Sequence, residues 1–298
     1  MYRFIEAERE GERSVNGACA VLEVSRAAYY EWSKQEPSVR ESEDMELIEK
    51  VKAIFTNSRR TYGSPRVHSE LRQQGRRCLR KRVERLMRQE GLQGRPPKRR
   101  RRTTIPDPEP PPELIDLIGR RFDPSGLALN AYWAGDITYV RTWEGWMYLA
   151  TVIDLASRRV VGWAMADHMR AELVCEALQM AIARRRPEPG LIFHSDRGSQ
   201  YTSKLFRGLL ERHGIRQSLA KPGQCWDNAV VEAFWSTLKV ELVQRHTRPT
   251  RAMARQAVFE WIESFYNLRR LHSSLGYRTP AAYEAAATGG ASRTGAVA

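Results

Sequence analysis

The sequence predicts an α/β layer fold preceded by small all-α modules. Two observations predict the layer fold: apolar, β-branched and aromatic runs begin at residue 132, and helical patterns alternate with them as far as residue 246. A third observation separates the modules, because residues 1–95 carry only helical spacing and a proline-rich stretch follows them. A chain of 298 residues is long enough for two or three folded units.

The positive charge of the chain is concentrated in one segment. Lys and Arg number 49 against 35 Asp and Glu, which gives a formal net charge of +14. Residues 59–102 hold 17 of the basic residues and three of the acids, so this segment carries the whole excess. A localised excess is typical of a region that neutralises phosphates, and it predicts a nucleic-acid partner. Charge patterning alone also fits a solvated helical face with a nonspecific basic tail.

Several protein classes are excluded by composition. No apolar run approaches the ~18 residues needed to cross a bilayer, so we expect no membrane contact. The first ten residues, MYRFIEAERE, lack the order of a secretory signal. The cysteines stand too far apart for a C-x-x-C pair, so we expect reduced thiols in a cytoplasm and no structural zinc. They are Cys19, Cys78, Cys175 and Cys225.

Two helical modules are expected before the proline-rich stretch. In the first, residues 1–40, the segment 14–33 predicts two short helices that are broken near Glu23, with Ser25 capping the second. This spacing fits a helix-turn-helix and a plain helical hairpin equally well. The second module, residues 41–95, predicts three helices: 44–56, one that begins at Ser64 with Pro65 in its first position, and 78–90.

The third helix of the second module is amphipathic and strongly basic. Its predicted apolar stripe is Leu79, Val83, Leu86 and Met87. The basic residues beside the stripe are expected to contact DNA phosphates, and they are Arg80, Lys81, Arg82, Arg85 and Arg88. A proline-rich basic linker is predicted at residues 96–125, in which Lys98, Arg99 and Arg100 are expected to follow the DNA backbone.

Residues 126–284 are expected to form the α/β domain with a C-terminal helical block. The predicted strands are 132–140, 146–153, 159–166, 191–194 and 215–219, and the predicted helices among them are 170–186 and 203–213. A long helix, capped by Asp227 or Asn228, is expected to end near His246, and Glu241 breaks its apolar side. A last helix is predicted at 251–267, and residues 285–298 are expected to be disordered.

Three carboxylates stand out in this domain. Asp136 interrupts the first strand, Asp196 follows the fourth, and Glu232 lies in the first turns of the long helix. Taken singly, Asp136 fits a carboxylate bonded to backbone N–H groups, Asp196 a turn residue, and Glu232 a solvated glutamate. Taken together, they match the needs of phosphoryl transfer, in which two divalent ions activate the attacking oxygen and stabilise the leaving one.

The predicted cofactor is therefore a pair of Mg²⁺ or Mn²⁺ ions, which prefer carboxylate oxygens. In this interpretation Asp136 binds both ions, Asp196 completes one site and Glu232 the other. The nucleophile is water or a DNA 3′-hydroxyl, and no covalent protein intermediate forms.

Other polar residues compete for a role at this site. Asp154 is the strongest rival as a metal ligand, although the stretch DLASRR is more simply a hairpin turn. His194 is expected to pack beside the site rather than to bind metal. Lys239 suits a phosphate contact or a solvated surface equally. Arg269, Arg270 and His272 fit either an approach to DNA or a cap on the final helix.

The assembled motifs resemble the second-frame product (OrfB) of the insertion-sequence-three family of bacterial transposases, whose DDE catalytic core is shared with retroviral integrases. The similar blocks are TYGSPRVHSELR, WAGDITYV, YLATVIDLASRRVVGW, HSDRGSQY, WDNAVVEAFWSTLK and YNLRRLHSSLGYRTPAAY, within residues 2–284. Thirty-five residues separate Asp196 from Glu232, the spacing typical of that family. Ala134 and Gly135 depart from it, since bulkier residues and a hydroxyl are more usual before the first acid.

The resemblance implies a ribonuclease-H-like integrase core, a mixed five-stranded sheet in which three antiparallel strands precede two parallel ones. It assigns catalysis to Asp136, Asp196 and Glu232. It also implies the upstream first-frame product as a fusion or partner, a homo-oligomer on DNA, and a place in the bacterial cytoplasm with the nucleoid.

The sequence predicts a transposase that binds the terminal repeats of a mobile element, cleaves beside their 3′ ends and joins those ends to target DNA. Two alternatives remain at this point. A noncatalytic DNA-binding regulator would keep the fold without nicking DNA, and a structure-specific nuclease would cut branched DNA without joining ends.

Overall fold

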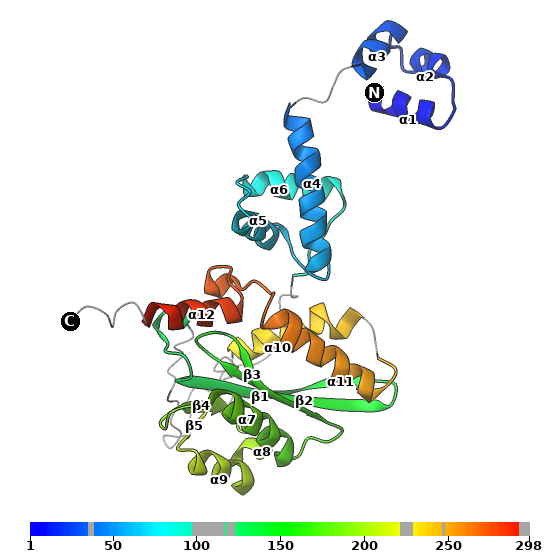
Figure 1. Cartoon of the computed structure of the whole chain (residues 1–298). Coiled ribbons are helices and arrows are strands. Elements are labelled where there is room, and N and C mark those ends of the chain that lie inside the picture. Colours follow the sequence, from blue (N-terminus) through cyan, green and yellow to red (C-terminus); the bar gives the residue numbers. More distant parts are fainter. Residues whose placement is uncertain (35–38, 97–116, 118–122, 221–228, 246–247, 292–298) are drawn as a thin grey trace, which may run out of the picture. The chain divides into compact units, whose positions relative to one another are not determined.

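The computed structural model describes residues 1–34, 39–96, 117, 123–220, 229–245 and 248–291 (Figure 1). Most of the predicted linker, with Lys98, Arg99 and Arg100, lies outside the described residues, as do Asp227 and Asn228. The chain divides into two compact units, Met1–Ala53 and Ile54–Ala298. None of the helices in the described residues has the length and apolar character of a membrane span.

The first unit contains three short helices and most of a fourth. They are α1 (Tyr2–Glu10), α2 (Val15–Val21), α3 (Arg26–Ser33) and α4 (Val39–Asn57), within which the division between the units falls. A small core of Ile5, Cys19 and Tyr29 joins α1, α2 and α3. The predicted break is present, because Glu23 has a φ of 53° and the Ser25 hydroxyl accepts a hydrogen bond from the Ala28 N–H at 3.1 Å. Helix α1 was not predicted, since only one of its residues is buried.

Two basic helices follow α4 in the second unit. They are α5 (Ser64–Gln73), with Pro65 in its first turn as expected, and α6 (Arg80–Gln89). Val83, Leu86 and Met87 are buried, but Leu79 is exposed. The prediction for Leu79 was wrong because the helix begins at Arg80, two residues later than predicted, which leaves Leu79 in extended backbone.

The α/β domain is built on a mixed five-stranded sheet, which confirms the predicted fold class. Its strands are β1 (Tyr132–Thr142), β2 (Gly145–Asp154), β3 (Val160–Ala166), β4 (Ile192–Ser195) and β5 (Arg216–Leu219). Their order is β3-β2-β1-β4-β5. Strands β1, β2 and β3 pair antiparallel, whereas β4 runs parallel to β1 and β5 parallel to β4.

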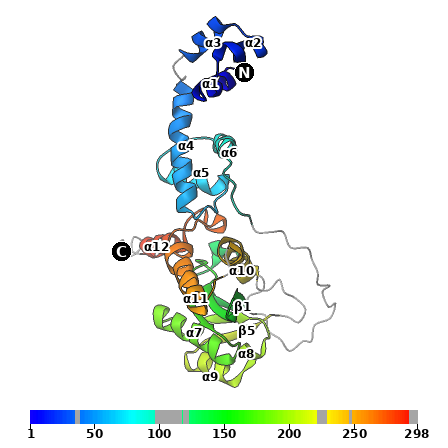
Figure 2. The same cartoon turned by 90° about the vertical axis from the view of Figure 1, so that its right-hand side faces the viewer.

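Helices cover both faces of this sheet, as the two views show (Figures 1 and 2). One face carries α7 (Ala171–Arg185), α8 (Ser199–Thr202) and α9 (Lys204–Arg212), and the other carries α10 (Ala229–Glu241) and α11 (Arg251–Phe259). Gly162 in β3 allows α7 to approach closely, because a Cβ atom there would lie 2.2 Å from the Ala177 carbonyl oxygen.

The C-terminal block differs from the prediction at three points. Helix α10 ends at Glu241 and is followed by a 3₁₀ turn, Val243–Arg245, so it is shorter than expected. The last helix, predicted as one element over 251–267, instead continues after α11 as a π-helical segment, Glu260–Tyr266, which buries Trp261, Ile262, Phe265 and Tyr266. The tail expected from residue 285 is helical as far as Ala291, because α12 (Pro280–Ala291) is anchored there through Glu284.

A buried ion pair explains the acid on the apolar side of α10. Glu241 and Arg270 are 2% and 4% exposed, and Arg270 donates to both carboxylate oxygens of Glu241, at 2.8 to 3.1 Å. Removing one partner of such a pair leaves an uncompensated buried charge, which costs about 3–5 kcal/mol. The pair therefore fixes α10 against the C-terminal block.

Side chains of the basic helical module attach it to the same block by hydrogen bonds to the backbone there. The Tyr62 hydroxyl donates to the Arg269 carbonyl oxygen at 3.2 Å and accepts from the Leu271 N–H at 2.7 Å. Arg66 donates to the Leu271 carbonyl oxygen at 2.9 Å, and the Gln73 amide to that of Tyr277 at 2.8 Å. Residues distant in sequence thus form one compact unit.

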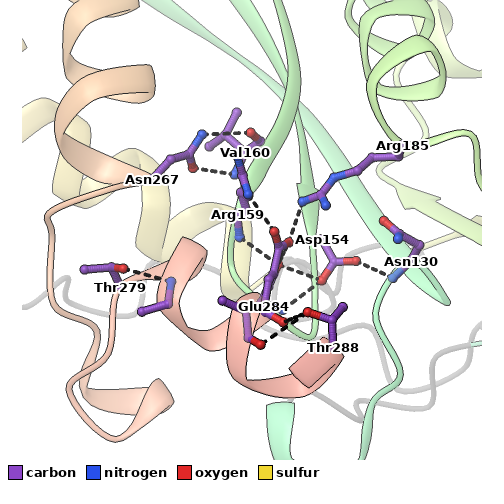
Figure 3. Close-up of polar contacts among 12 residues, drawn as sticks. Asn130, Asp154, Arg159, Val160, Arg185, Asn267, Thr279, Glu284 and Thr288 are labelled. Atoms are coloured by element: carbon purple, nitrogen blue, oxygen red, sulfur yellow. Dashed lines mark hydrogen bonds and ion pairs between the residues drawn. The ribbon is translucent and has the colours of Figure 1, made fainter. Parts of the chain in front are cut away.

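A second polar cluster holds α12 against the β2–β3 hairpin (Figure 3). Glu284 accepts hydrogen bonds from Ser157 at 2.8 Å, from Arg159 at 2.6 Å and from Arg185. Burial alone would raise the pKa of Glu284, but Arg185, Ser157 and Arg159 outweigh it and hold the pKa below its ordinary value. The nearby Asn267 side chain bonds both the N–H and the carbonyl oxygen of Val160, each at 3.0 Å.

Replacing Glu284 should remove a pH-dependent part of the stability. A carboxyl whose pKa is lower in the folded state stabilises the fold above its unfolded pKa, and this contribution is lost as the pH falls through the folded pKa. We expect Glu284→Gln to lower the free energy of unfolding by about 1.5–3 kcal/mol at pH 7, with the difference from the parent shrinking below about pH 5. Urea unfolding at several pH values measures this, and the exposed Glu188→Gln is the control. A difference that does not depend on pH would contradict the assignment.

Candidate active site

Asp136 lies in the middle of β1 with both carboxylate oxygens hydrogen-bonded. Oδ1 accepts from the Ile137 N–H at 2.7 Å, and Oδ2 accepts from the indole N–H of Trp235 on α10 at 2.9 Å. The pKa of Asp136 is raised to about 6, mainly by burial and further by the charges of Asp196 and Glu232, while the two hydrogen bonds oppose this shift. The strand therefore holds an acid that is costly to ionise and oriented from two sides.

Asp196 lies beside Asp136 because of the register of β1 and β4. These strands run parallel and pair as far as Ala134 opposite His194, and each aspartate lies two residues further along the chain, Asp136 within β1 and Asp196 just after β4. Asp196 is exposed, and its Oδ1 accepts from the Gly198 N–H at 3.0 Å in a tight turn. It thus follows the carboxyl end of β4, where open α/β sheets place their sites.

Glu232 reaches the same region from α10. It lies three residues before Trp235, so the two side chains share one face of the helix, and Trp235 contacts Asp136 directly. Glu232 is half-buried and contributes to the raised pKa of Asp136. Searched throughout the described residues, His, Cys, Asp and Glu side chains form no group of three that is close enough to hold a metal ion.

The chemistry of these donors nevertheless suits a hard divalent cation. Each carboxylate oxygen of Asp136 accepts one hydrogen bond, and a carboxylate oxygen has room for a second partner. Burial and two acidic neighbours penalise the ionised form of Asp136, and a bound cation offsets that penalty. Carboxylate oxygens are also the ligands that Mg²⁺ and Mn²⁺ prefer.

Gly135 is explained by the packing under the site. A Cβ atom at this position would lie 2.4 Å from the Phe193 ring, which fills the space that a larger residue would need. Phe193 is buried and packs against Tyr201 of α8 and Phe206 of α9. Gly135 and Phe193 therefore fit each other, and the departure from the usual residue is compensated.

The structure assigns other roles to the rival residues Asp154 and His194. Asp154 is fully buried and accepts from the N–H groups of Ser157 and Asn130, each at 2.7 Å, so it closes the hairpin turn between β2 and β3 (Figure 3). Burial raises the pKa of Asp154. His194 is buried, and its Nδ1 lies 2.9 Å from the Ser218 hydroxyl, so it packs beside the site.

The residues after the last long helix do not form one DNA-facing set. Arg270 is committed to Glu241, and His272 is buried against the Tyr266 ring, whose centroid lies 4.8 Å away. Arg269 is exposed. Lys239 on α10 places its ammonium 5.3 Å from the centroid of the Tyr139 ring on β1.

The basic side chains of α6 lie off its buried stripe, as predicted. Arg80, Lys81 and Arg88 are exposed, whereas Arg82 and Arg85 are half-buried. A groove of about 720 Å³ separates this module from the turn at Gly276–Tyr277, and Arg80, Arg72 and His68 line it. Sequence reasoning missed Arg72, because the groove is completed by a segment distant in sequence.

Comparison with known proteins gives consistent matches along the chain. Residues 128–225 and 213–280 match the integrase core domain, and residues 42–100 match an HTH-like domain. The transposase InsF for insertion sequence IS3A of Escherichia coli K12 is 41% identical over 290 residues, covering 95% of this chain and 98% of that protein. The uncharacterized 31 kDa protein of insertion element IS600 from Shigella sonnei is 40% identical over 265 residues, covering 89% and 96%.

Among solved structures, the HTLV-2 integrase catalytic core domain in complex with magnesium aligns with a TM-score of 0.38 and 19% identity. The alignment covers 52% of this chain and 96% of that chain.

A side chain at position 135 should disturb both packing and the site. We expect Gly135→Ala to lower the free energy of unfolding by about 1–3 kcal/mol, because its Cβ overlaps the Phe193 ring. Chemical denaturation of Gly135→Ala, Phe193→Leu and the double variant measures the coupling. A double variant that loses less stability than the sum of the singles supports the contact, and strict additivity would contradict it.

Proposed function

The chain belongs to the family of IS3 insertion-sequence transposases, and we propose that it binds the terminal repeats of a mobile element, cleaves beside their 3′ ends and joins those ends to target DNA. The family membership rests on 41% identity over nearly the whole chain and on the integrase core match. The single structural observation that carries the proposed chemistry is the position of Asp136. Its carboxylate is held from two sides and lies within electrostatic reach of Asp196 and Glu232.

We assign the catalytic site to these three acids. Asp136, Asp196 and Glu232 would hold two Mg²⁺ or Mn²⁺ ions, with Asp136 binding both. When bound, such ions activate the attacking oxygen and stabilise the leaving one. Trp235 and the Ile137 N–H fix the carboxylate plane of Asp136. The attacking group is water during cleavage and the DNA 3′-hydroxyl during joining, so both steps use one site.

DNA binding is assigned to the basic helical module and to Lys239. The exposed side chains of α6 and the adjoining groove supply cations spaced along one surface. Lys239 lies on the same helix as Glu232, which suits a phosphate contact near the reacting DNA end. Lys98, Arg99 and Arg100 would extend this path along the DNA backbone.

The proposed activity also implies partners and a location. Joining two element ends to one target requires more than one active site near the DNA, so we infer a homo-oligomer on DNA. We further infer that the first-frame product assists recognition of the element ends, as a fusion or as a partner. The substrate places the protein with the bacterial nucleoid in the cytoplasm.

Neutralising each acid tests the catalytic assignment. We expect Asp136→Asn, Asp196→Asn and Glu232→Gln each to lower strand transfer by more than about 100-fold, the upper end of the effect of altering only a partner of a metal ligand. The measurement is strand transfer of labelled element ends by purified protein in Mg²⁺, and chelation of the metal should abolish it. Glu211→Gln, an exposed acid on α9, is the matched control. Intact transfer in any of the three variants would refute its assignment.

Neutralising basic residues of α6 tests the DNA-binding assignment separately. We expect the combined Arg80→Gln, Lys81→Gln and Arg85→Gln substitutions to weaken DNA binding, and to reduce the slope of log affinity against log salt by up to about 3, because each phosphate contact releases about one counterion. Fluorescence anisotropy at several salt concentrations measures the slope.

The matched control removes the same charge from another surface. Lys204, Arg207 and Arg212 are exposed on α9, on the opposite side of the sheet from α10. Their triple glutamine variant should keep most of the salt dependence. Equal slopes of log affinity against log salt for the two triple variants would contradict the assignment of the DNA contact to α6.

A further inference from the structure

The far half of the β1–β2 hairpin extends beyond β4 and β5, while β3 accompanies β2 as far as Tyr148. Strand β1 pairs with β4 only over Tyr132–Ala134, whereas its pairing with β2 continues to Thr142 opposite Gly145. Figure 1 shows β4 and β5 near one end of β1, with the hairpin continuing past them. Among the described strands, none pairs with β1 on the β4 side between Gly135 and Arg141.

Three large aromatic side chains are exposed on this part of the hairpin. Tyr139 is 56% exposed, Trp143 76% and Trp146 47%. Tyr139 and Trp146 pack edge to face with ring centroids 5.1 Å apart, so one ring supports the other. Single exposed apolar residues need no explanation, but a cluster of three aromatic rings on one hairpin marks an interaction surface.

Cations accompany these rings. The Arg141 guanidinium lies 5.9 Å from the centroid of the Trp146 ring, and the Lys239 ammonium lies beside Tyr139. At the tip, the backbone N–H of Trp143 donates to the Arg248 carbonyl oxygen at 3.3 Å, while the Arg248 guanidinium donates to the Leu242 carbonyl oxygen at 3.0 Å.

The two acids near the tip contact Arg251. Glu144 accepts from the Arg251 N–H at 2.7 Å, and Asp167 pairs with its guanidinium at 3.4 Å. Arg141 and Lys239 lie against the rings of Trp146 and Tyr139, so cationic side chains accompany the aromatic ones on this surface.

The aromatic cluster begins close to the assigned catalytic acids. Tyr139 follows Asp136 by three residues, so its side chain leaves the opposite face of β1, where its ring meets the ammonium of Lys239 on α10. Lys239 follows Trp235 by one helical turn on α10. Asp136 and Tyr139 thus contact side chains that lie one turn apart on α10, and this helix brings the ring close to the acid.

We propose that Tyr139, Trp143 and Trp146 form a stacking platform for unpaired DNA bases next to the cleavage point. This inference rests on the proposed function and names the substrate form that the site takes. Bases stack on exposed rings regardless of sequence, while nearby Lys and Arg neutralise the phosphates between them. A second copy of this surface is the poorer occupant, because it would bring like charges together.

The test measures binding of the full-length chain to a single-stranded oligo-dT of about twelve nucleotides and to the same strand with abasic sites replacing the central three bases. The abasic strand keeps every phosphate and loses the stacking faces. In EDTA, so that no cleavage occurs, we expect the parent to bind oligo-dT about tenfold more tightly than the abasic strand. Trp143→Ala and Trp146→Ala should reduce that ratio toward one, and Trp143→Phe should restore most of it.

Controls separate this inference from the proposed function. Phe259→Ala removes an aromatic ring that is 44% exposed on α11 and packs beside Trp163, and it should keep the full ratio. The proposed platform would be refuted if the parent bound oligo-dT and the abasic strand equally, or if Trp143→Ala and Trp146→Ala left the ratio of the two affinities unchanged. Neither result would bear on strand transfer. Loss of strand transfer in Mg²⁺ by the parent would instead refute the proposed function.

Discussion

The hydrogen bond from Trp235 to Asp136 is the contact on which the arrangement of the site depends. It joins the central strand of the sheet to the helix that carries Glu232, two elements far apart in sequence. The indole can only donate, and a carboxylate that accepts is stabilised in its ionised form. One contact therefore sets the position of α10 over β1 and orients the acid that the other two approach.

This arrangement has an energetic cost that is offset elsewhere in the domain. A carboxylate with a pKa of about 6 beside two other acids is less stable than an apolar residue at the same place would be. The buried Glu241–Arg270 pair fixes the opposite end of α10, and the Glu284 cluster fixes α12. Both anchors lie away from the assigned acids, so the fold tolerates an electrostatically costly site without losing its register.

The strands of the sheet could be predicted from the sequence because each strand carries its own local signal. Runs such as WMYLATVI and RVVGWAMA are apolar and β-branched throughout, and turn residues bound them. Asp136 stood out because Asp is unusual inside a strand, whereas Asp196 and Glu232 were singled out only in combination with it. Helix α12 was missed because its alanine-rich sequence resembles a tail, and what holds it is Glu284 meeting arginines from two distant elements.

Partners across long sequence distances could not be predicted in the same way. Glu241 was visible as an acid on an apolar helix face, but nothing local identified Arg270 as its partner. Gly135 was visible as a departure from the usual pattern, and only the packing of Phe193 explains it. Trp235 carried a usable signal, because it follows Glu232 by three residues, but an indole on a helix is far more often a core residue than a donor to a catalytic carboxylate.

The unequal lengths of the strands account for both surfaces that we assign to DNA. In an open α/β sheet a site forms where parallel strands end, and β4 ends at Ser195, one residue before Asp196. Strand β1 continues for six residues past Asp136, so an acid in the middle of a strand lies at the same edge as a residue at the end of its neighbour. The remainder of β1 then pairs with no described strand on that side. One face of it is covered, with Thr138, Val140 and Thr142 buried, while the other face exposes Tyr139 and Arg141. The long central strand thus carries an assigned acid beside the end of β4 and exposed side chains further along, which is why we assign the two surfaces to one substrate.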